Sequence, residues 1–373
     1  MSTELKIFRD SILNSIRSSN KVFIVGHNEP DFDAIGSAIG IHALAGSFDK
    51  EAYIIVNDDA LSLEPGVKKI IDEHKDKYNI INLCEAKKLI DDNSLLIVTD
   101  TNKDYLVSVK EDLDKFKEIF IIDHHEPDIH TINGKKYINT EASSACEIIA
   151  NLMIAERIKI NPNVASYLLS GIFLDTKRFK QNTSSKTHDI AEKLLNRGAD
   201  TDYVNELFQA DFVSDAKINN LIFNYTIFKE YAEKTLIPRK VSFTLNRNNP
   251  TTVYRKEEIA KAADRMLKYG VDASFVMGFN KDGQVSISAR GIKKPQASFP
   301  LIGQIKAGEI LQKLDFDHCG GNTFSAGGII SIDNEKFHDI FEVEQTLMDI
   351  VEKELSPQEQ DEKPKVLKLE RNA

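Results

Sequence analysis

Short apolar runs alternate with helix-like stretches in the first part of the chain. Four runs rich in β-branched residues have the length and composition of buried strands, at residues 21–25, 52–56, 94–100 and 118–125. Stretches with helical spacing of apolar positions separate or flank them, at residues 3–18, 38–44, 65–73, 163–179, 185–196 and 201–209. This alternation predicts an α/β fold with a mostly parallel, doubly wound sheet covered by helices on both faces.

The pattern changes near residue 213. A connecting helix is predicted at 215–225 and an amphipathic helix at 254–269, followed by strands 273–279 and 284–289 that flank the hairpin signal Asn280-Lys281-Asp282-Gly283. A last helix is predicted at 337–355. We therefore expect four parts: a first domain at 1–212, a connecting helix and linker at 213–229, a smaller α+β domain at 230–355, and a disordered charged tail at 356–373.

Polar residues of one kind end three of the predicted strands. His27, Asp31 and Asp33 follow the first strand, Asp100 ends the third, and Asp123, His124 and His125 end the fourth. Parallel strands bring such ends to one edge of a sheet, where ligands bind. In the alternative interpretation of the first segment, Asp33 caps the next helix and Asp31 is solvated. We favour one metal site, because it explains all three strand ends together.

Two further segments carry candidate residues. Asp175 lies in a segment too apolar to be a solvated face, so its charge needs a partner: a metal, or as the alternative a salt bridge to Lys177 or Arg178. Ser144 and Glu147 have the spacing of a capping box. They predict a plain helix start, although a serine-capped helix N-terminus is also suited to binding an anion.

Composition narrows the function. The 373 residues are 41% hydrophobic and 28% charged, as in an ordinary soluble globular protein, and the apolar runs are too short to span a membrane. The N-terminus lacks the features of a signal peptide, so we expect a cytoplasmic protein. Three scattered cysteines indicate neither disulfides nor a thiolate metal site. The net charge of −10 argues against binding long nucleic acid.

The candidate ligands are rich in carboxylate oxygen, with some imidazole and no sulfur. This set suits Mn²⁺ or Mg²⁺ better than structural Zn²⁺. So many carboxylates at one edge would repel each other without cations, and we expect two metal ions bridged by Asp100. Such a pair activates a water and neutralises charge on phosphorus, which predicts hydrolysis of a phosphate ester or anhydride. The leaving alkoxide would take its proton from a water or from His125.

These residues resemble the motifs of a known family. Asp123-His124-His125, the pattern from His27 to Ser37, Asp100 and Asp175 together resemble the DHH/DHHA1 phosphoesterases over nearly the whole chain up to the tail. Members include cyclic di-AMP phosphodiesterases, nanoRNase/pAp phosphatases and RecJ-type exonucleases. Residues 142–147 and 171–179, continuing to 197–200, look most like the catalytic module of GdpP-type cyclic di-AMP phosphodiesterases, here expected as a stand-alone form without membrane segments.

The resemblance implies roles for individual residues. His27 and Asp31 would bind one Mn²⁺, Asp33, His124 and Asp175 the other, and Asp100 both, with Mg²⁺ or Co²⁺ as alternative metals. Asp123 would support the metal ligands, and His125 would contact the scissile phosphate. The predicted substrate contacts are Ser143, Ser144, Ser288, Arg290, Gly320, Gly321 and Asn322. In the second domain they include a strand that carries an arginine and a glycine-rich loop, which suits close contact with phosphate.

Two residues depart from the family pattern. Asn322 stands where histidine is expected after the glycines, and Asn102 stands where the GdpP type often has histidine. We expect both on the substrate side, where they affect substrate choice. The predicted function is Mn²⁺-dependent hydrolysis of cyclic di-AMP to linear pApA. The alternative is a nanoRNase/pAp phosphatase that degrades short oligonucleotides, and the third possibility is a silent nucleotide sensor. A homodimer is also expected.

Overall fold

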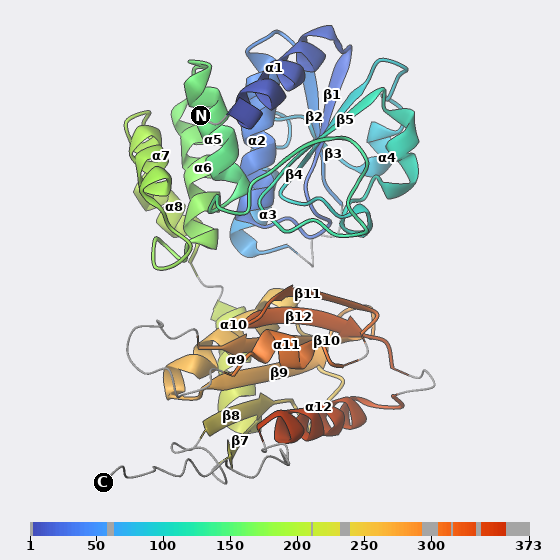
Figure 1. Ribbon diagram of the computed structural model, residues 1–373, viewed down its shortest axis with the longest axis vertical. Helices are drawn as coiled ribbons and strands as arrows, with labels where there is room; N and C mark the ends of the chain where they lie inside the picture. Colours follow the sequence, from blue (N-terminus) through green and yellow to red (C-terminus); the bar gives the residue numbers. More distant parts are fainter. Residues whose placement is uncertain are drawn as a thin grey trace, which may run out of the picture. The chain divides into compact units, whose positions relative to one another are not determined.

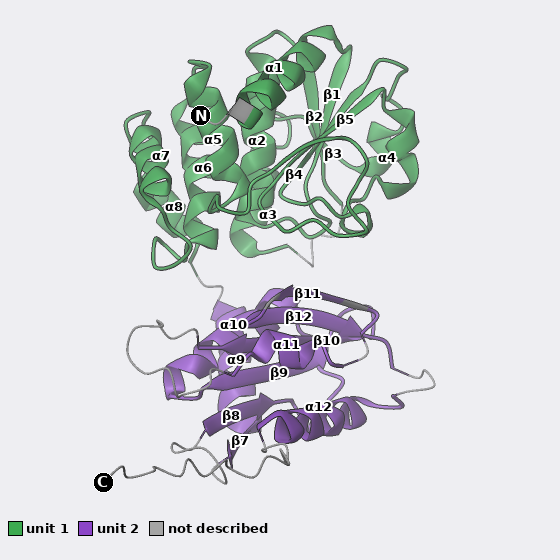
Figure 2. Cartoon of the chain, in the orientation of Figure 1, with its two compact units in different colours: residues 1–209 green, residues 210–373 purple. Residues whose placement is uncertain are grey.

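The computed structural model describes residues 3–57, 63–209, 212–231, 239–292, 305–314, 316–332 and 337–355. The chain divides into two compact units, residues 1–209 and 210–373 (Figure 2). The predicted tail at 356–373 lies outside the described residues.

Unit 1 is built around a six-stranded sheet. Its strands are β1 (Lys21–Val25), β2 (Glu51–Ile55), β3 (Ile80–Ile81), β4 (Leu95–Thr99), β5 (Glu118–Asp123) and β6 (Lys135–Ile138). Its helices are α1 (Thr3–Ser18), α2 (Phe32–Gly46), α3 (Pro65–His74), α4 (Leu83–Ala86), α5 (Ala145–Ala155), α6 (Pro162–Asp175), α7 (Ser185–Leu195) and α8 (Thr201–Leu207), with 3₁₀ turns η1 (Asp104–Leu106) and η2 (Lys110–Lys115). The strand order is β3-β2-β1-β4-β5-β6 and every pairing is parallel.

Both faces of this sheet are buried, as the sequence predicts. Val22 and Ile24 of β1 belong to the core shared with α1, α2, α5 and α6, whereas Phe23 and Val25 belong to a second core on the opposite face. Successive side chains of a strand point to opposite faces, so a fully apolar strand serves two cores. In Figure 1, α4 lies on the other side of the sheet from α2 and α5.

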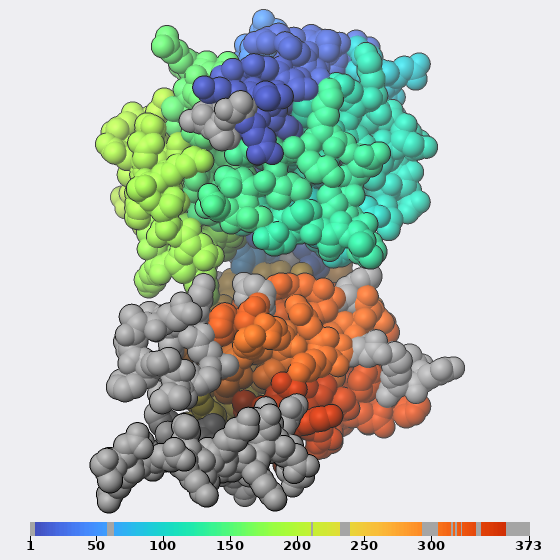
Figure 3. Space-filling view, in the orientation of Figure 1, coloured from blue at the N-terminus to red at the C-terminus, as the bar shows by residue number. Residues whose placement is uncertain are grey.

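The outer strands of the sheet were not predicted. β3 has two residues, and β6 reads Lys-Lys-Tyr-Ile, so neither has a long apolar run that would mark a buried strand. Helix α1 lies against β5 and β6, with the ring of Phe8 5.6 Å from that of Phe120 and 5.7 Å from that of Tyr137. The space-filling view shows this N-terminal helix, in blue, at the surface of unit 1 (Figure 3).

The helix predicted at 163–179 ends early. α6 stops at Asp175, and Lys177, Arg178 and Phe179 have φ angles of 46°, 58° and 62°, in the left-handed region. The hydroxyl of Thr176 accepts a 2.9 Å hydrogen bond from the N–H of Phe179, which stabilises the turn. Asp175 is therefore the last residue of a helix, and not part of its middle.

Unit 2 contains a second six-stranded sheet, in the order β11-β12-β10-β9-β8-β7. The strands are β7 (Thr226–Tyr231), β8 (Arg239–Thr244), β9 (Ala273–Phe279), β10 (Val285–Gly291), β11 (His318–Asn322) and β12 (Ser325–Ile330). The helices are α9 (Phe212–Tyr225), α10 (Lys256–Met266), α11 (Ala307–Leu311) and α12 (Ile340–Leu355), with a 3₁₀ turn η3 (Leu267–Tyr269). Among the strands that the structure describes in this unit, β8 and β9 pair in parallel and the other neighbours pair antiparallel, so the unit is α+β.

The glycine-rich segment at 320–328 is not a loop. Gly320 and Gly321 lie in β11, Gly327 and Gly328 lie in β12, and the two strands form an antiparallel hairpin. Gly321 has a φ of 135°, and a Cβ at Gly328 would collide with the ring of Phe316. The glycines thus serve a tight hairpin. Within the described part of the chain, none of the helices is long and apolar enough to cross a bilayer.

Candidate metal centre

The sheet of unit 1 has a switch point between β1 and β4. From β1 the chain first adds β2 and β3 on one side and then returns to add β4 and β5 on the other. The connections that follow the two central strands therefore lie on opposite faces of the sheet, and the carboxyl ends of β1 and β4 meet at the position where open α/β sheets bind ligands. His27 follows β1 and Asp100 follows β4, so the predicted residues lie at these strand ends.

One group of side chains comes from the ends of these two strands. His27 Nε2 lies 3.5 Å from Asp100 Oδ2 and 3.7 Å from Asp31 Oδ1. Asp100 is 3% exposed, so its carboxylate is almost entirely enclosed by protein. These three residues offer one imidazole and two carboxylates to a single point.

A second group lies on the other side of Asp100. His124 Nε2 is 3.4 Å from Asp100 Oδ1, 3.2 Å from Asp175 Oδ2 and 3.8 Å from Asp33 Oδ2. The two oxygens of Asp100 therefore face different groups. Asp175 thus has the ring of His124 as a neighbour, as its interpretation as a metal ligand requires.

The spacing within both groups fits metal ligands better than hydrogen-bonded ion pairs. Hydrogen bonds between charged groups are typically about 2.7–2.9 Å long. Neighbouring ligands on an octahedral ion at about 2.1 Å lie roughly 3 Å apart. The separations of 3.2–3.8 Å are too long for such hydrogen bonds, and both Asp100 Oδ1 and His124 Nε2 are buried without a hydrogen-bond partner, so a cation between them would supply the missing interaction.

Helix N-termini hold two of the carboxylates. Asp31 is the N-cap of α2, and its Oδ1 accepts hydrogen bonds from the N–H groups of Asp33 and Ala34 at 2.9 and 3.1 Å. Asp33 accepts from the N–H groups of Ala145 and Cys146 at the start of α5, at 2.7 and 2.8 Å. In the alternative interpretation of this segment Asp33 is the cap, whereas the structure shows Asp31 in that position. Each oxygen of Asp33 keeps one lone pair for a further partner, and Oδ2 of Asp31 accepts neither of the two cap hydrogen bonds.

The start of α5 is thus already occupied by protein groups. Ser144 Oγ accepts from the N–H of Glu147 at 3.0 Å, and Ser143 Oγ donates to Glu147 Oε2 at 2.7 Å. Both serines are buried, at 0% and 2% exposure. The capping role of Ser144 is present, whereas this geometry does not favour Ser143 and Ser144 as substrate contacts, which remain a prediction.

Backbone conformation and close packing fix two ligands further. Asp100 has a φ of 59°, a left-handed conformation that aspartate tolerates and that turns the chain sharply after β4. A Cβ at Gly171 of α6 would lie 2.6 Å from Asp33 Oδ1 and 2.5 Å from Cys146 Sγ. Only glycine allows α6 to approach Asp33 this closely.

The carboxylates and imidazoles shift each other's protonation. Burial lowers the pKa of His27, but the neighbouring carboxylates of Asp100 and Asp31 outweigh it and raise the pKa to about 10. Burial likewise lowers the pKa of His124, and Asp100, Asp175 and Asp33 raise it to about 10. Burial and the charge of Asp100 raise the pKa of Asp33 to about 7.

The remaining two carboxylates shift in opposite directions. Burial raises the pKa of Asp100, but His124 and His27 outweigh it and bring the pKa below its usual range. Burial and the charge of Asp33 raise the pKa of Asp175 well above its usual range. The site therefore concentrates negative charge that a cation would stabilise.

Asp123 lies behind the two groups and is fully buried. Its Oδ1 accepts from the N–H groups of His124 and His125, at 2.7 and 3.2 Å, and lies 2.8 Å from His125 Nδ1. The side chain of His125 is 57% exposed. Asp123 therefore orients the motif, and the other ring nitrogen of His125 is left to face outward.

From the sequence, Asn102 is expected on the substrate side, and the structure shows a different position. It is fully buried, and its amide donates to Asp123 Oδ2 at 2.6 Å and to the carbonyl of His125 at 3.0 Å. The departure from the family pattern thus concerns the support of the Asp-His-His motif. The sequence shows only that an asparagine follows a strand, and this does not distinguish an amide that faces the substrate from one that is buried behind the motif.

The predicted contacts of unit 2 lie on neighbouring strands. Ser288 of β10 and Gly320 of β11 both pair with Gly327 of β12, and the backbones of Arg290 and Asn322 both pair with Ser325. The guanidinium of Arg290 donates to Ser288 Oγ at 2.8 Å and lies 3.3 Å from Asp264. The sheet brings these positions together, while the side chain of Asn322 lies outside the described residues.

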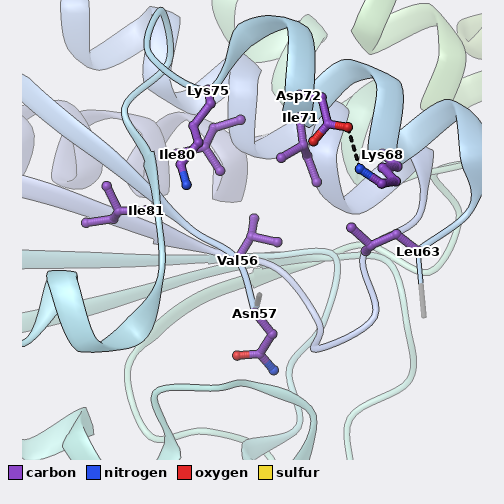
Figure 4. Close-up of a pocket in the computed structure, with 9 residues that line it drawn as sticks. All are labelled: Val56, Asn57, Leu63, Lys68, Ile71, Asp72, Lys75, Ile80 and Ile81. Carbon is purple, nitrogen blue, oxygen red and sulfur yellow. Dashed lines mark hydrogen bonds and ion pairs between the residues drawn. The ribbon is translucent and has the colours of Figure 1, made fainter. Parts of the chain in front are cut away.

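A separate cavity of about 120 Å³ lies at the ends of β2 and β3, beside α3 (Figure 4). Its lining is mostly apolar, and Lys68 and Asp72 form an ion pair at its rim. None of the predicted site residues lines it. The chemistry of the chain is therefore concentrated in the carboxylate cluster and not in this cavity.

Comparison with known proteins shows which sequences this chain resembles. Residues 21–172 match the model described as "DHH family, N-terminal domain". The cyclic-di-AMP phosphodiesterase GdpP of Geobacillus thermodenitrificans is 33% identical over 77% of this chain and 43% of its own length. The bifunctional oligoribonuclease and PAP phosphatase NrnA of Mycoplasma genitalium is 27% identical over 57% of the chain and 64% of its own length.

A solved structure supports the fold. An exopolyphosphatase-related protein from Bacteroides fragilis matches with a TM-score of 0.70 and 21% identity, over 94% of this chain and 97% of its own. The chain spans less than half the length of the GdpP relative, 43%. The similarity therefore concerns the part of that relative that this chain covers.

Proposed function

We propose that the chain, whose residues 21–172 match the N-terminal domain of the DHH family, is a metal-dependent phosphodiesterase that hydrolyses cyclic di-AMP to linear pApA. The observation that carries the proposal is the position of Asp100, whose two oxygens face two separate groups of ligands, at 3.4 and 3.5 Å. The similarity to GdpP over 77% of the chain supports the choice of substrate.

The residues divide into two proposed ligand sets. His27 and Asp31 would hold one cation, Asp33, His124 and Asp175 the other, and Asp100 both. We propose Mn²⁺, with Mg²⁺ or Co²⁺ as alternatives, since carboxylate and imidazole ligands suit these ions. When bound, the two ions would supply an activated water and neutralise charge on phosphorus.

The remaining residues would position the substrate and its protons. The exposed ring of His125, protonated on both nitrogens, would donate the Nε2 proton to the leaving oxygen and return to the neutral form with its hydrogen on Nδ1, which Asp123 holds. Arg290 would pair with a phosphate, with Ser288, Gly320, Gly321 and Asn322 near it along the sheet of unit 2. A cytoplasmic location, a homodimer and the absence of membrane or long nucleic-acid partners remain part of the proposal.

The second candidate is a nanoRNase/pAp phosphatase. The similarity to NrnA, of which the chain covers 64%, favours it. A silent nucleotide sensor is disfavoured because all the predicted ligands are present and lie together.

A time course with parallel substrates separates these functions. Purified protein with Mn²⁺ is given cyclic di-AMP, pApA, short RNA and pAp, and the products are separated by chromatography. Loss of cyclic di-AMP with accumulation of pApA is expected. Faster conversion of pApA and short RNA to AMP, with the cyclic form unchanged, would establish the second candidate, and no turnover of any substrate would leave the sensor.

A further inference from the structure

Asn102 connects two segments that the sequence keeps apart. It lies three residues beyond the end of β4, whereas Asp123 ends β5 and His125 follows it. One amide group donates to both, to the Asp123 carboxylate at 2.6 Å and to the His125 carbonyl at 3.0 Å. The amide oxygen of Asn102 in turn accepts from the hydroxyl of Thr131 at 3.4 Å.

The carboxylate of Asp123 needs this amide. Its Oδ1 is engaged by donors of the motif itself, the N–H groups of His124 and His125 and the ring of His125. Its Oδ2 accepts from Asn102, and the residue is 0% exposed, so water is excluded as a substitute. A buried carboxylate oxygen that loses its donor tends to move or to become protonated.

The orientation of His125 depends on Asp123. The carboxylate accepts from Nδ1, which fixes the tautomer with the hydrogen on Nδ1 and leaves Nε2 on the exposed side of the ring. The amide of Asn102 donates hydrogen bonds to two parts of this arrangement: the carboxylate of Asp123, which holds the ring, and the backbone carbonyl of His125.

We propose that Asn102 is a positioning residue, which holds Asp123 and the backbone of His125 so that the His125 ring presents Nε2 to the substrate. The inference deepens the proposed function and rests on it. It assigns to Asn102 a role in turnover, although the side chain is buried and does not touch substrate.

Three substitutions test the role of the amide hydrogens. Asn102→Asp keeps the shape but has no N–H donor and adds a charge beside Asp123, and Asn102→Ala removes the group. Both should lower kcat by about 10–100-fold, the usual effect of losing a residue that orients the groups of a metal site, with KM changed less than about threefold. Asn102→His restores one N–H donor and should recover part of the lost kcat.

Two matched controls separate positioning from general loosening. Asn93→Ala removes an amide that donates to the carbonyl of Ser18 at 2.9 Å, at the opposite end of β4. Lys135→Met removes the ammonium that lies 2.8 Å from Glu118, at the start of β5 and at the other end of that strand from Asp123. Both should keep kcat within about threefold of the original. Melting temperature and bound metal are measured on every variant, and kcat is compared at a temperature and metal concentration at which every variant is folded and loaded.

A second readout does not use activity. With ¹⁵N-labelled histidine, NMR of the magnesium-loaded protein should show the Nδ1–H tautomer of His125 in the original protein and a mixture in Asn102→Asp. An unchanged tautomer in that variant overturns the inference. The inference is also overturned if lost metal or lost stability accounts for the lower kcat, or if the substitution changes KM and leaves kcat unchanged. If the original protein hydrolyses none of the nucleotides, the proposed function fails, and the NMR comparison still decides the inference.

Discussion

The N–H group of Cys146, in the first turn of α5, donates a 2.8 Å hydrogen bond to Oδ1 of Asp33 on α2. The adjacent N–H of Ala145 donates to Oδ2 of the same carboxylate at 2.7 Å. The positive end of the α5 dipole thus faces a proposed metal ligand. Helix α6 also passes close to Asp33, at Gly171.

Gly171→Ala should displace the carboxylate of Asp33, a proposed metal ligand. The added methyl group would lie 2.6 Å from Asp33 Oδ1, so the carboxylate or the helix must move. We expect a loss of about 1–3 kcal/mol in the free energy of unfolding, as for other overpacked sites, together with weaker metal binding. Urea unfolding and metal analysis measure the two effects. Gly46→Ala, at the end of α2 with no atom within 4 Å of the new methyl group, is the control. Equal metal affinity in both variants would contradict the close packing.

Asp100→Ala should remove both cations and abolish turnover. Its carboxylate faces His27 on one side and His124 on the other, so neither group keeps a complete ligand set. We expect a rate loss of about 10⁴-fold or more, within the range of enzymatic rate enhancement. Elemental analysis and the nucleotide time course provide the measurements. Asp91→Ala, which changes a carboxylate before β4, should keep metal and activity. Normal Mn²⁺-dependent turnover in Asp100→Ala would refute the shared-ligand assignment.

Metal binding should release protons near neutral pH. The pKa values of His27 and His124 are raised to about 10 by the carboxylates, so both rings are protonated at pH 7 in metal-free protein. A cation requires neutral imidazoles, so affinity should rise with pH between about 7 and 10. Titration calorimetry in two buffers of different ionisation enthalpy measures the proton count. Identical heats in both buffers would show that the rings are already neutral.

His42 should make unit 1 sensitive to acid. Burial lowers its pKa to about 4, and its Nε2 has no hydrogen-bond partner. The unfolded chain therefore binds a proton near pH 6.5 that the folded state refuses, so stability present above pH 6.5 is lost as the pH falls toward 4, by at most about 3 kcal/mol. Hydrogen exchange of α2 in chelator at pH 7 and 4.5 measures the loss. His42→Phe should reduce it, whereas the exposed His188→Gln should not. The same acid loss in His42→Phe would exclude this histidine as the cause.

The sequence allowed some of this arrangement to be predicted, for physical reasons. The central strands are apolar on both faces, so they are visible as runs, and the parallel sheet then carries His27, Asp100 and His124 to one edge. The support of Asp33 by α5 could not be predicted in the same way, because backbone N–H groups exist at every residue except proline. The glycines of 320–328 were interpreted as a loop because glycine is common in turns, although here it serves a strand hairpin.

The strand order also has a consequence for assembly of the protein. His27 and Asp100 are far apart in the chain and become neighbours only when β4 pairs with β1 on the side opposite β2. A chain in which this pairing is missing or misplaced retains the same histidines and aspartates but has no shared carboxylate between them. The average number of tightly bound cations per chain would therefore report the fraction of molecules in a preparation in which β4 has paired correctly with β1.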